Sequence, residues 1–383
     1  MAGATLERQL TGRQTARVRF GIADPTDDAD IRRLLRDTPM VGQISLSLER
    51  EPNYFADAGI SGESKQTIIA RDKGRLVCLG SCAVRECFVN GEPRRVGYLG
   101  GLRLDSQYAG RFDILRRGYE FFREIQTDAP VDFYFTSIAV DNERARNFLE
   151  RGIAEMPRYE FIGEYVTVLI PTSDRRLASD ENCGPGKLDQ DTPALDDLIA
   201  VLNDSNKQRQ FAPCWTANGL RALEPLGLRT SDFRVARKNG KPIACGALWD
   251  QRCFKQTVIR DYAPWLKFSL PVMNGVNRIL SSPRLPAVGE TLANAFASPL
   301  AFASEGTPEF PNFIQVLRRT ARQRKVEYVT LGFATNDPHL AMVQKAFPHR
   351  NYRSRLYVVR WPDIGGSATA LDGRMVAPEV SLL

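Results

Sequence analysis

Apolar side chains recur along the chain at strand or at helical spacing, and residues 94–124 contain both patterns in succession. A polar turn, residues 105–111, separates a predicted strand from a predicted helix. The strand positions are Val96, Tyr98, Leu102 and Leu104, and the helix positions are Ile114, Leu115, Tyr119 and Phe122. Helix N-termini carry unpaired N–H groups and partial positive charge, so such a unit can bind phosphate, although most such turns bind nothing. Here Gly110 permits close approach of a phosphate and Arg111 adds a positive charge.

Further periodic segments predict strands over 17–22, 44–50, 132–139 and 161–170 and helices over 26–37 and 142–151. Part of this pattern occurs twice. Residues 70–88 align without a gap on residues 236–254 at an offset of 166 (236 − 70), with six identical positions. Both copies predict a β-hairpin, with Lys73-Gly74 or Asn239-Gly240 at the turn.

Two more matches follow in the same order. Residues 134–142 match 328–336 at an offset of 194 (328 − 134), and residues 165–171 match 356–362. In the first of these pairs a buried strand precedes an asparagine, Asn142 or Asn336, that is expected to open a helix. The difference in offset, 28 residues (194 − 166), predicts an insertion at about 255–289 that forms a lid or an interdomain packing arm.

The repeat predicts two domains, residues 1–173 and 188–363, joined by a linker over 174–187, which is rich in turn-forming residues. Residues 364–383 form a tail that is either docked or frayed. A chain of 383 residues is also too long for one ordinary core.

Composition is that of a globular protein, with 43% hydrophobic and 25% charged residues. No apolar run is long enough to span a membrane and residues 1–20 lack an apolar signal core, so a cytoplasmic location is expected. Seven cysteines without CxxC spacing and two histidines predict reduced thiols and no metal site. The net charge of +7 is compatible with an anionic cofactor, or with nucleic acid as a less favoured partner, and is most often only a solvated surface.

The order strand, helix, short strand, hairpin, strand, turn, helix, strand, helix, strand resembles the GNAT acetyltransferase superfamily. Residues 102–111, LRLDSQYAGR, are similar to that family's cofactor segment, in which V-x-P-x-Y leads into (Q/R)-x-x-G-x-(G/A) and backbone amides hold the pyrophosphate of acetyl-CoA. The resemblance spans nearly the whole chain. It implies an α/β fold with mixed sheets, made of two tandem GNAT-like domains.

Two registers of this turn remain open. With Tyr108 on the family's aromatic position the turn is 109–114, which lacks the leading Gln/Arg and both glycines. With Gln107 as the leading residue the turn is 107–112, which keeps Gln107 and Gly110 and has Phe112 at the last position. The spacing from the preceding strand favours the first register. The second register is favoured by the chemistry of the turn, because it keeps the glutamine and the central glycine. The cofactor residues that the resemblance implies are Leu102, Arg103, Leu104, Gln107, Tyr108, Ala109, Gly110, Arg111, Phe112 and Asn142.

Residues 142–151 resemble the family's N-x-x-A-x-x-x-Y-E-R helix, whose Asn lies near pantetheine and whose Tyr often protonates the leaving thiolate. Asn142 is kept, but Leu149 replaces that tyrosine, so the usual general acid is missing. In the second copy Glu305 falls opposite Arg111 and would repel a pyrophosphate. At most one cofactor site is therefore expected, in the first copy.

Acyl transfer from a thioester to an amine needs a deprotonated amine, a backbone donor for the carbonyl oxygen and a proton for the thiolate. Gly100-Gly101 would provide a strand bulge carrying that donor, or would merely allow close packing. Candidates for the base are Glu86 and Glu160, and candidates for the acid are Tyr98 and Tyr134. Any one of them is as well explained as an ordinary half-buried strand residue.

The leading hypothesis is an acyl-CoA-dependent N-acyltransferase. Its cofactor would be acetyl-CoA or another acyl-CoA, and its acceptor a small-molecule or peptide amine. The alternatives are a binding or scaffold protein on the same fold and a transferase that takes an aminoacyl group from tRNA.

Overall fold

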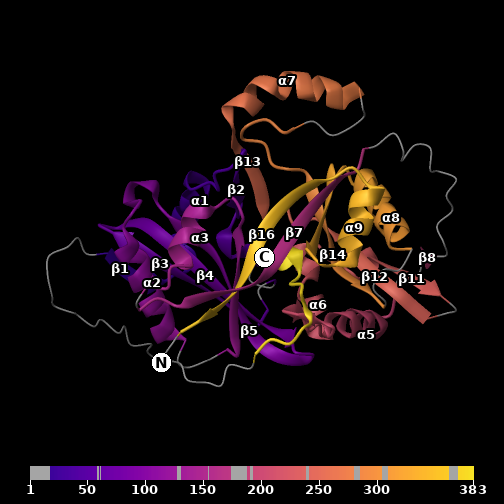
Figure 1. Cartoon of the computed structure of the whole chain (residues 1–383), viewed down its shortest axis with the longest axis horizontal. Coiled ribbons are helices and arrows are strands. Elements are labelled where there is room, and N and C mark those ends of the chain that lie inside the picture. The colour runs from indigo at the N-terminus through magenta and orange to yellow at the C-terminus, as the bar shows by residue number, and fades with distance from the viewer. Residues whose placement is uncertain are drawn as a thin grey trace.

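One mixed β-sheet runs through the whole molecule (Figure 1). The computed structural model describes residues 18–57, 60, 62–126, 131–153, 155–173, 188–189, 193–238, 241–279, 285–303, 309–361 and 370–383. In spatial order the strands are β1 (Val18–Ile22), β3 (Ser64–Asp72), β4 (Arg75–Val89), β5 (Glu92–Leu104), β6 (Phe133–Ala139), β16 (Arg350–Arg360), β7 (Arg158–Pro171), β15 (Tyr328–Ala334), β14 (Asn294–Phe302), β12 (Lys241–Trp249), β11 (Phe233–Lys238) and β8 (Leu188–Asp189), and β10 (Ala212–Pro213) pairs with β4.

Helices cover this sheet in two groups, one for each repeat (Figure 1). The helices are α1 (Asp28–Asp37), α2 (Phe112–Ile125), α3 (Glu143–Leu149), α5 (Leu195–Asn206), α6 (Ala217–Arg221), α7 (Pro264–Ile279), α8 (Phe310–Gln323) and α9 (Pro338–Ala346). The largest buried cluster packs α8 and α9 against β7, β14 and β15. On the first repeat, α2 packs over β4 through Ile114 and Phe122.

The predicted duplication is present in the strand pairing. In the first repeat β3, β4 and β5 are antiparallel and β5 then pairs in parallel with β6. In the second, β11, β12 and β14 are antiparallel and β14 pairs in parallel with β15. The first hairpin turns at Lys73 and Gly74, both with positive φ, as predicted. The second hairpin also forms, but its turn, Asn239-Gly240, lies outside the described residues.

The last strands of the two repeats exchange neighbours. β7, which closes the first repeat, pairs with β15 of the second, and β16, which closes the second, pairs with β6 of the first. β7 and β16 also pair with each other, so the two repeats share one sheet. The domain boundaries predicted from the repeat stay predictions, and the predicted linker, 174–187, lies outside the described residues.

The insertion ties the second repeat to the first. Its strand β13 (Gln256–Tyr262) pairs with β2 (Ile44–Glu49) in a separate two-stranded sheet, so it is a packing arm between the repeats. α7 follows β13 and projects from the body of the molecule (Figure 1), with Trp265 and Phe268 exposed. None of the described helices is long and apolar enough to span a membrane.

The tail is docked where the structure describes it, from residue 370 onward. Its strand β17 (Met375–Val376) pairs in parallel with β9 (Arg209–Gln210), and Val380 and Ser381 are buried.

One helix start differs from the prediction. Asn142 caps α3 as expected, accepting the Ala145 N–H at 3.2 Å, whereas α9 is capped by Asp337 and not by Asn336. Pro338 follows directly, and a proline at the first helical position needs no partner for an N–H.

Candidate functional site

The parallel strands β5 and β6 separate near the middle of the first repeat. They pair from Val96 opposite Phe133 to Leu99 opposite Thr136, and beyond this point each strand continues beside a different neighbour, β4 or β16. At the point of separation the Thr136 hydroxyl donates to the Leu99 carbonyl oxygen at 2.6 Å. A gap between two parallel strands exposes backbone groups that would otherwise be paired, so it is a place where an extended ligand can bind.

A β-bulge lies on β5 directly after this point. The pairing with β4 shifts by one residue between Leu79 opposite Arg103 and Ser81 opposite Gly100. Gly101 has φ +66°, a left-handed conformation that glycine adopts without strain. Gly101 and Leu102 are exposed although they lie within a strand of the main sheet. Of the two readings of Gly100-Gly101, the bulge is the one that forms.

The turn before α2 uses most of its own amides. The N–H groups of Tyr108, Ala109, Arg111 and Phe112 donate to carbonyl oxygens within the turn. Gly110 has φ +92° and a Cβ added there would meet nothing within 4 Å, so its backbone is open to a ligand. The Arg111 guanidinium makes two hydrogen bonds, 2.7 and 2.8 Å, to the Asp113 carboxylate, which holds the pKa of that carboxyl below its usual range.

The other predicted cofactor residues have different environments. Leu104 packs under α2 beside Ile114, and the Tyr108 hydroxyl donates to Asp72 at 2.8 Å. Gln107 and Ala109 are exposed. Phe112, the first residue of α2, stacks on Phe148 of α3 with ring centroids 4.6 Å apart, and thereby links the two helices that flank the gap. Leu149, in the place of the family tyrosine, is buried.

Among the predicted catalytic residues, Tyr98 lies at the gap. It precedes the bulge, and a Cβ added at Gly100 would lie 2.9 Å from its ring. Its ring packs on Phe135 with centroids 5.0 Å apart. Burial raises the pKa of Tyr98 to about 12, with the neighbouring hydroxyl of Tyr352 adding to the effect. Tyr98 therefore stays protonated at neutral pH.

Tyr134 and the two glutamates lie elsewhere. Tyr134 packs against Phe122 and Trp361, with centroids 5.4 and 5.5 Å away, and burial raises its pKa. Glu86 is exposed on β4 opposite Arg95, five residues beyond the Ser81 position that faces the bulge, or roughly 17 Å along the strand. Glu160 is an exposed residue paired with Arg360 at 3.1 Å. The structure does not bring these three side chains to the gap.

Two residues near Tyr98 were missed by sequence reasoning. Arg50, just after β2, and Tyr352, on β16, both act electrostatically on Tyr98 and on the half-buried Arg103. Burial is the main cause of a raised pKa of about 12 for Tyr352. These side chains come from segments far apart in the chain, and no local pattern in the sequence marks them as neighbours.

The corresponding gap in the second repeat is occupied by the tail. β14 and β15 pair only as far as Phe296 opposite Thr330. Beyond that point the Ser298 and Ser381 hydroxyl oxygens lie 2.5 Å apart, and Tyr165 donates to the Pro378 carbonyl oxygen at 2.7 Å. Glu305, the basis for expecting no cofactor here, lies outside the described residues. The docked tail is an independent reason for the same expectation.

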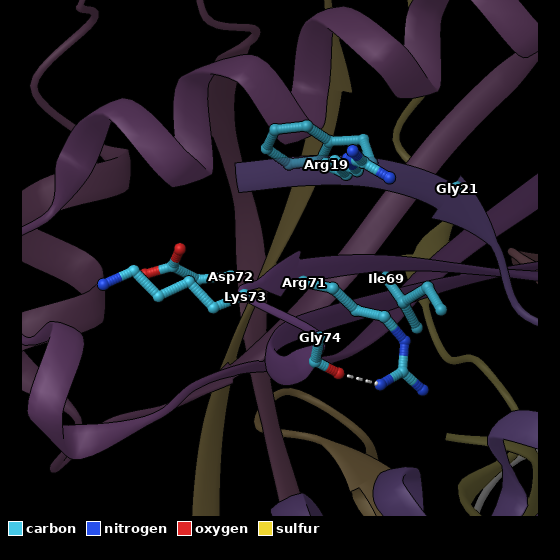
Figure 2. Close-up of a pocket in the computed structure, with 8 residues that line it drawn as sticks. Arg19, Gly21, Ile69, Arg71, Asp72, Lys73 and Gly74 are labelled. Atoms are coloured by element: carbon cyan, nitrogen blue, oxygen red, sulfur yellow. Dashed lines mark hydrogen bonds between the residues drawn. The ribbon is translucent and has the colours of Figure 1, made fainter. Parts of the chain in front are cut away.

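A shallow hollow at the β1–β3 edge, lined by Arg19, Arg71, Lys73 and Gly74 among others, is rich in cations (Figure 2). Arg71 is already paired with Asp27 at 2.6 Å and Asp30 at 2.7 Å, and it donates to the Gly74 carbonyl oxygen. Figure 2 shows Lys73 pointing away from Arg71. The cations of this hollow do not converge on a ligand.

Within the described residues no cluster of three or more His, Cys, Asp or Glu side chains is arranged to hold a metal ion.

No protein-family model and no curated protein sequence matches the chain. Solved structures do match. N-myristoyltransferase of Saccharomyces cerevisiae with bound myristoyl-CoA superimposes with a TM-score of 0.57 at 11% identity, over 96% of this chain and 90% of that one. A GCN5-related N-acetyltransferase from Sphaerobacter thermophilus gives a TM-score of 0.52 at 11% identity, over 89% of this chain and 95% of that one.

A third match is the GCN5-related glucosamine N-acetyltransferase region of a fungal multi-domain GH3 β-N-acetylglucosaminidase. Its TM-score is 0.55 at 13% identity, over 90% of this chain and 38% of that one. At such identities the likeness concerns the fold. The chain therefore has the GNAT fold, in the doubled form found in N-myristoyltransferase.

Proposed function

We propose that the protein is an acyl-CoA-dependent N-acyltransferase that acts on the amine of a small molecule or a peptide, with one site at the gap between β5 and β6. The observation that carries this proposal is the bulge at Gly101 placed directly after the point where two parallel strands separate. A bulge turns a backbone N–H out of the ladder, and acyl transfer needs such a donor at the carbonyl oxygen.

The residues at the gap fit an acyl-CoA. Exposed Gly101 and Leu102 offer a strand edge to the amides of a pantetheine arm, and the exposed Asn142 lies at the start of α3 across the gap. Gly110 offers an open backbone to a diphosphate, beside the positive charge of Arg111. The Asp113 carboxylate competes with a bound diphosphate for Arg111, so the contribution of Arg111 to diphosphate binding is reduced.

An acyl-CoA supplies a thioester whose carbonyl carbon the acceptor amine attacks, and the new C–N bond replaces the C–S bond. The bulge holds its N–H toward the oxygen that gains negative charge. A thiol has an ordinary pKa of about 8.5, well below that of Tyr98, so Tyr98 would keep its proton while the C–S bond breaks. The proton that the sulfur needs then comes from the attacking nitrogen.

The test is acyl transfer by the purified protein, followed as release of free CoA thiol from acetyl-, octanoyl- and myristoyl-CoA with a panel of amines. Gly110→Glu should abolish acyl-CoA binding in calorimetry, because it places a carboxylate at the diphosphate position. Gly74→Glu is the matched control, since Gly74 also has positive φ, +85°, and nothing within 4 Å of an added Cβ. Both variants should lose about the same 1–2 kcal/mol of stability, so equal acyl-CoA affinity in the two would refute the proposed cofactor position.

A second candidate, a non-catalytic binding protein, is favoured by the turn before α2. Four of its amides are used internally, and Arg111 is paired with Asp113. This candidate predicts that no acyl-CoA binds at millimolar concentration and that no amine is acylated. Measurable turnover with any member of the panel would eliminate it.

A further inference from the structure

Arg103 is a half-buried cation beside the bulge. Its Nε atom is inaccessible to solvent and has no hydrogen-bond partner, and its Nη1 donates only to the neighbouring Leu102 carbonyl oxygen at 2.9 Å. Within the described residues no carboxylate pairs with it. Other arginines near this site do have such partners, as Arg75 with Asp105 at 2.7 Å and Arg111 with Asp113 at 2.7 Å.

A half-buried guanidinium without a counter-ion is unfavourable, since a charge partly removed from water needs a partner of opposite sign. Loss of solvation lowers the pKa of Arg103, and repulsion from the charged neighbour Arg50 lowers it further. Arg50 itself is paired with Asp57 at 3.3 Å, and Asp57 also binds Lys65 at 2.6 Å. The protein thus neutralises Arg50 and leaves the charge of Arg103 uncompensated.

The orientation of Arg103 separates it from the cofactor turn. The next residue, Leu104, packs beneath α2, and successive strand residues point to opposite faces of a sheet. Arg103 therefore faces the side away from α2, where Tyr98 and Tyr352 influence its charge. Diphosphate bound at the start of α2 would lie on the other face. Arg103 is two residues from Gly101, or roughly 7 Å along the strand.

Tyr98 and Tyr352, whose charges would influence that of Arg103, are two further hydrogen-bond donors near it. Both hydroxyls remain protonated at neutral pH, because burial raises their pKa to about 12. Each can therefore donate a hydrogen bond, and a guanidinium offers two parallel N–H donors that match a carboxylate. Because Arg103 is two residues from Gly101 on the same strand, an anion that it binds lies on the same part of β5 as the amine that is acylated.

We propose that the acceptor is an amino acid or a closely related amino carboxylate, whose carboxylate is bound by Arg103 between Tyr98 and Tyr352 while its amine faces the bulge at Gly101. This inference rests on the proposed function and names the acceptor class of the same site. It also explains why a half-buried arginine is kept here without a carboxylate partner among the described residues.

The experiment compares amino acids with amines that lack only the carboxylate, such as leucine with isopentylamine. Binding is measured by calorimetry and thermal shift, and turnover by thiol release. We expect the wild-type protein to prefer leucine in both assays. Arg103→Gln should raise KM for the amino acid on the order of 10- to 100-fold, the usual effect of losing a charged hydrogen bond, and leave KM for acyl-CoA unchanged. It should also abolish the preference.

Two further variants separate a binding role from a structural one. Arg94→Gln, at an exposed position on the same strand, should retain the preference for leucine. Arg103→Met should raise Tm in the absence of ligand, because it removes an uncompensated, half-buried charge, whereas replacing an arginine that stabilises the fold would lower Tm.

The outcomes distinguish this inference from the proposed function. Turnover of isopentylamine as good as that of leucine would overturn the inference and leave the acyltransferase proposal intact. Leucine binding that requires Arg103, without any acyl transfer, would refute the acyltransferase and keep the anion site. Absence of any amino acid binding to the wild-type protein would overturn the inference directly.

Discussion

Replacing Gly332 by alanine tests whether the tail fills the gap of the second repeat. A Cβ at this position of β15 would lie 2.1 Å from the Tyr165 hydroxyl oxygen and 2.6 Å from the Val380 Cβ. Non-bonded carbon atoms approach to about 3.5–4 Å. Either the tail or the tyrosine must therefore move, and the hydrogen bond from Tyr165 to the Pro378 carbonyl oxygen, 2.7 Å, is lost with them.

The size of the effect follows from these contacts. Overpacking a well-filled core costs about 1–3 kcal/mol and a buried hydrogen bond contributes about 1 kcal/mol, so the free energy of unfolding should fall by about 2–4 kcal/mol. A chain of 383 residues that unfolds as one unit has an unfolding entropy of about 0.8 kcal/mol/K. The expected decrease in Tm is therefore about 3–5 °C.

Calorimetry measures Tm, and limited trypsin digestion with mass spectrometry measures release of the tail by cleavage after Arg374. Gly275→Ala is the control, because it adds the same atom within α7 at a place where nothing lies within 4 Å. Its Tm should be equal or slightly higher, since alanine favours a helix over glycine. A Gly332→Ala protein with wild-type Tm and wild-type cleavage at Arg374 would show that the tail does not occupy this gap.

Two further predictions concern the first gap and the junction of the repeats. Thr136→Val should lower stability by about 1–2 kcal/mol, since the Leu99 carbonyl oxygen loses its hydroxyl donor, and Thr136→Ser should restore it; equal Tm values for the two variants would contradict this reasoning. Burial, with repulsion from Arg50, lowers the pKa of Lys255 to about 7, against some attraction from Asp57. Unfolded lysine titrates near 10.4, so the unfolded chain binds the extra proton above pH 7 and stability should rise by up to about 2 kcal/mol from pH 7 to pH 9. Urea unfolding at both pH values should show this rise in the wild-type protein and its absence in Lys255→Met.

Much of the local structure could be predicted from the sequence. The first hairpin, the strand–turn–helix unit and the helix capped by Asn142 lie where periodicity and turn residues place them. The repeat predicted two copies of one topology, and the resemblance to GNAT enzymes predicted the fold that the solved structures share. The candidate site was predicted in part, because Tyr98 and the Gly100-Gly101 bulge do lie at the gap.

Other features required the tertiary structure. Arg318 begins the basic stretch of residues 318–325, which by charge alone would be expected at the solvated surface. Arg318 is nevertheless only 2% exposed, and its Nη2 donates to the Pro171 carbonyl oxygen at 2.7 Å. Glu86, chosen by residue type and strand position, lies at the wrong end of its strand for the gap. In both cases the sequence gives the kind of element but not the neighbour that a side chain meets.

The sequence by itself determined most of the strands and helices of the first repeat, and that part of the pattern occurs twice. Only the tertiary structure decided that the closing strands exchange between repeats, that the tail enters the second gap, and that Tyr352 lies near enough to Arg103 to influence its charge. The physical reason is that spacing of apolar residues encodes burial, whereas a strand edge can pair with any other backbone. The choice among such partners is made by packing across the whole molecule.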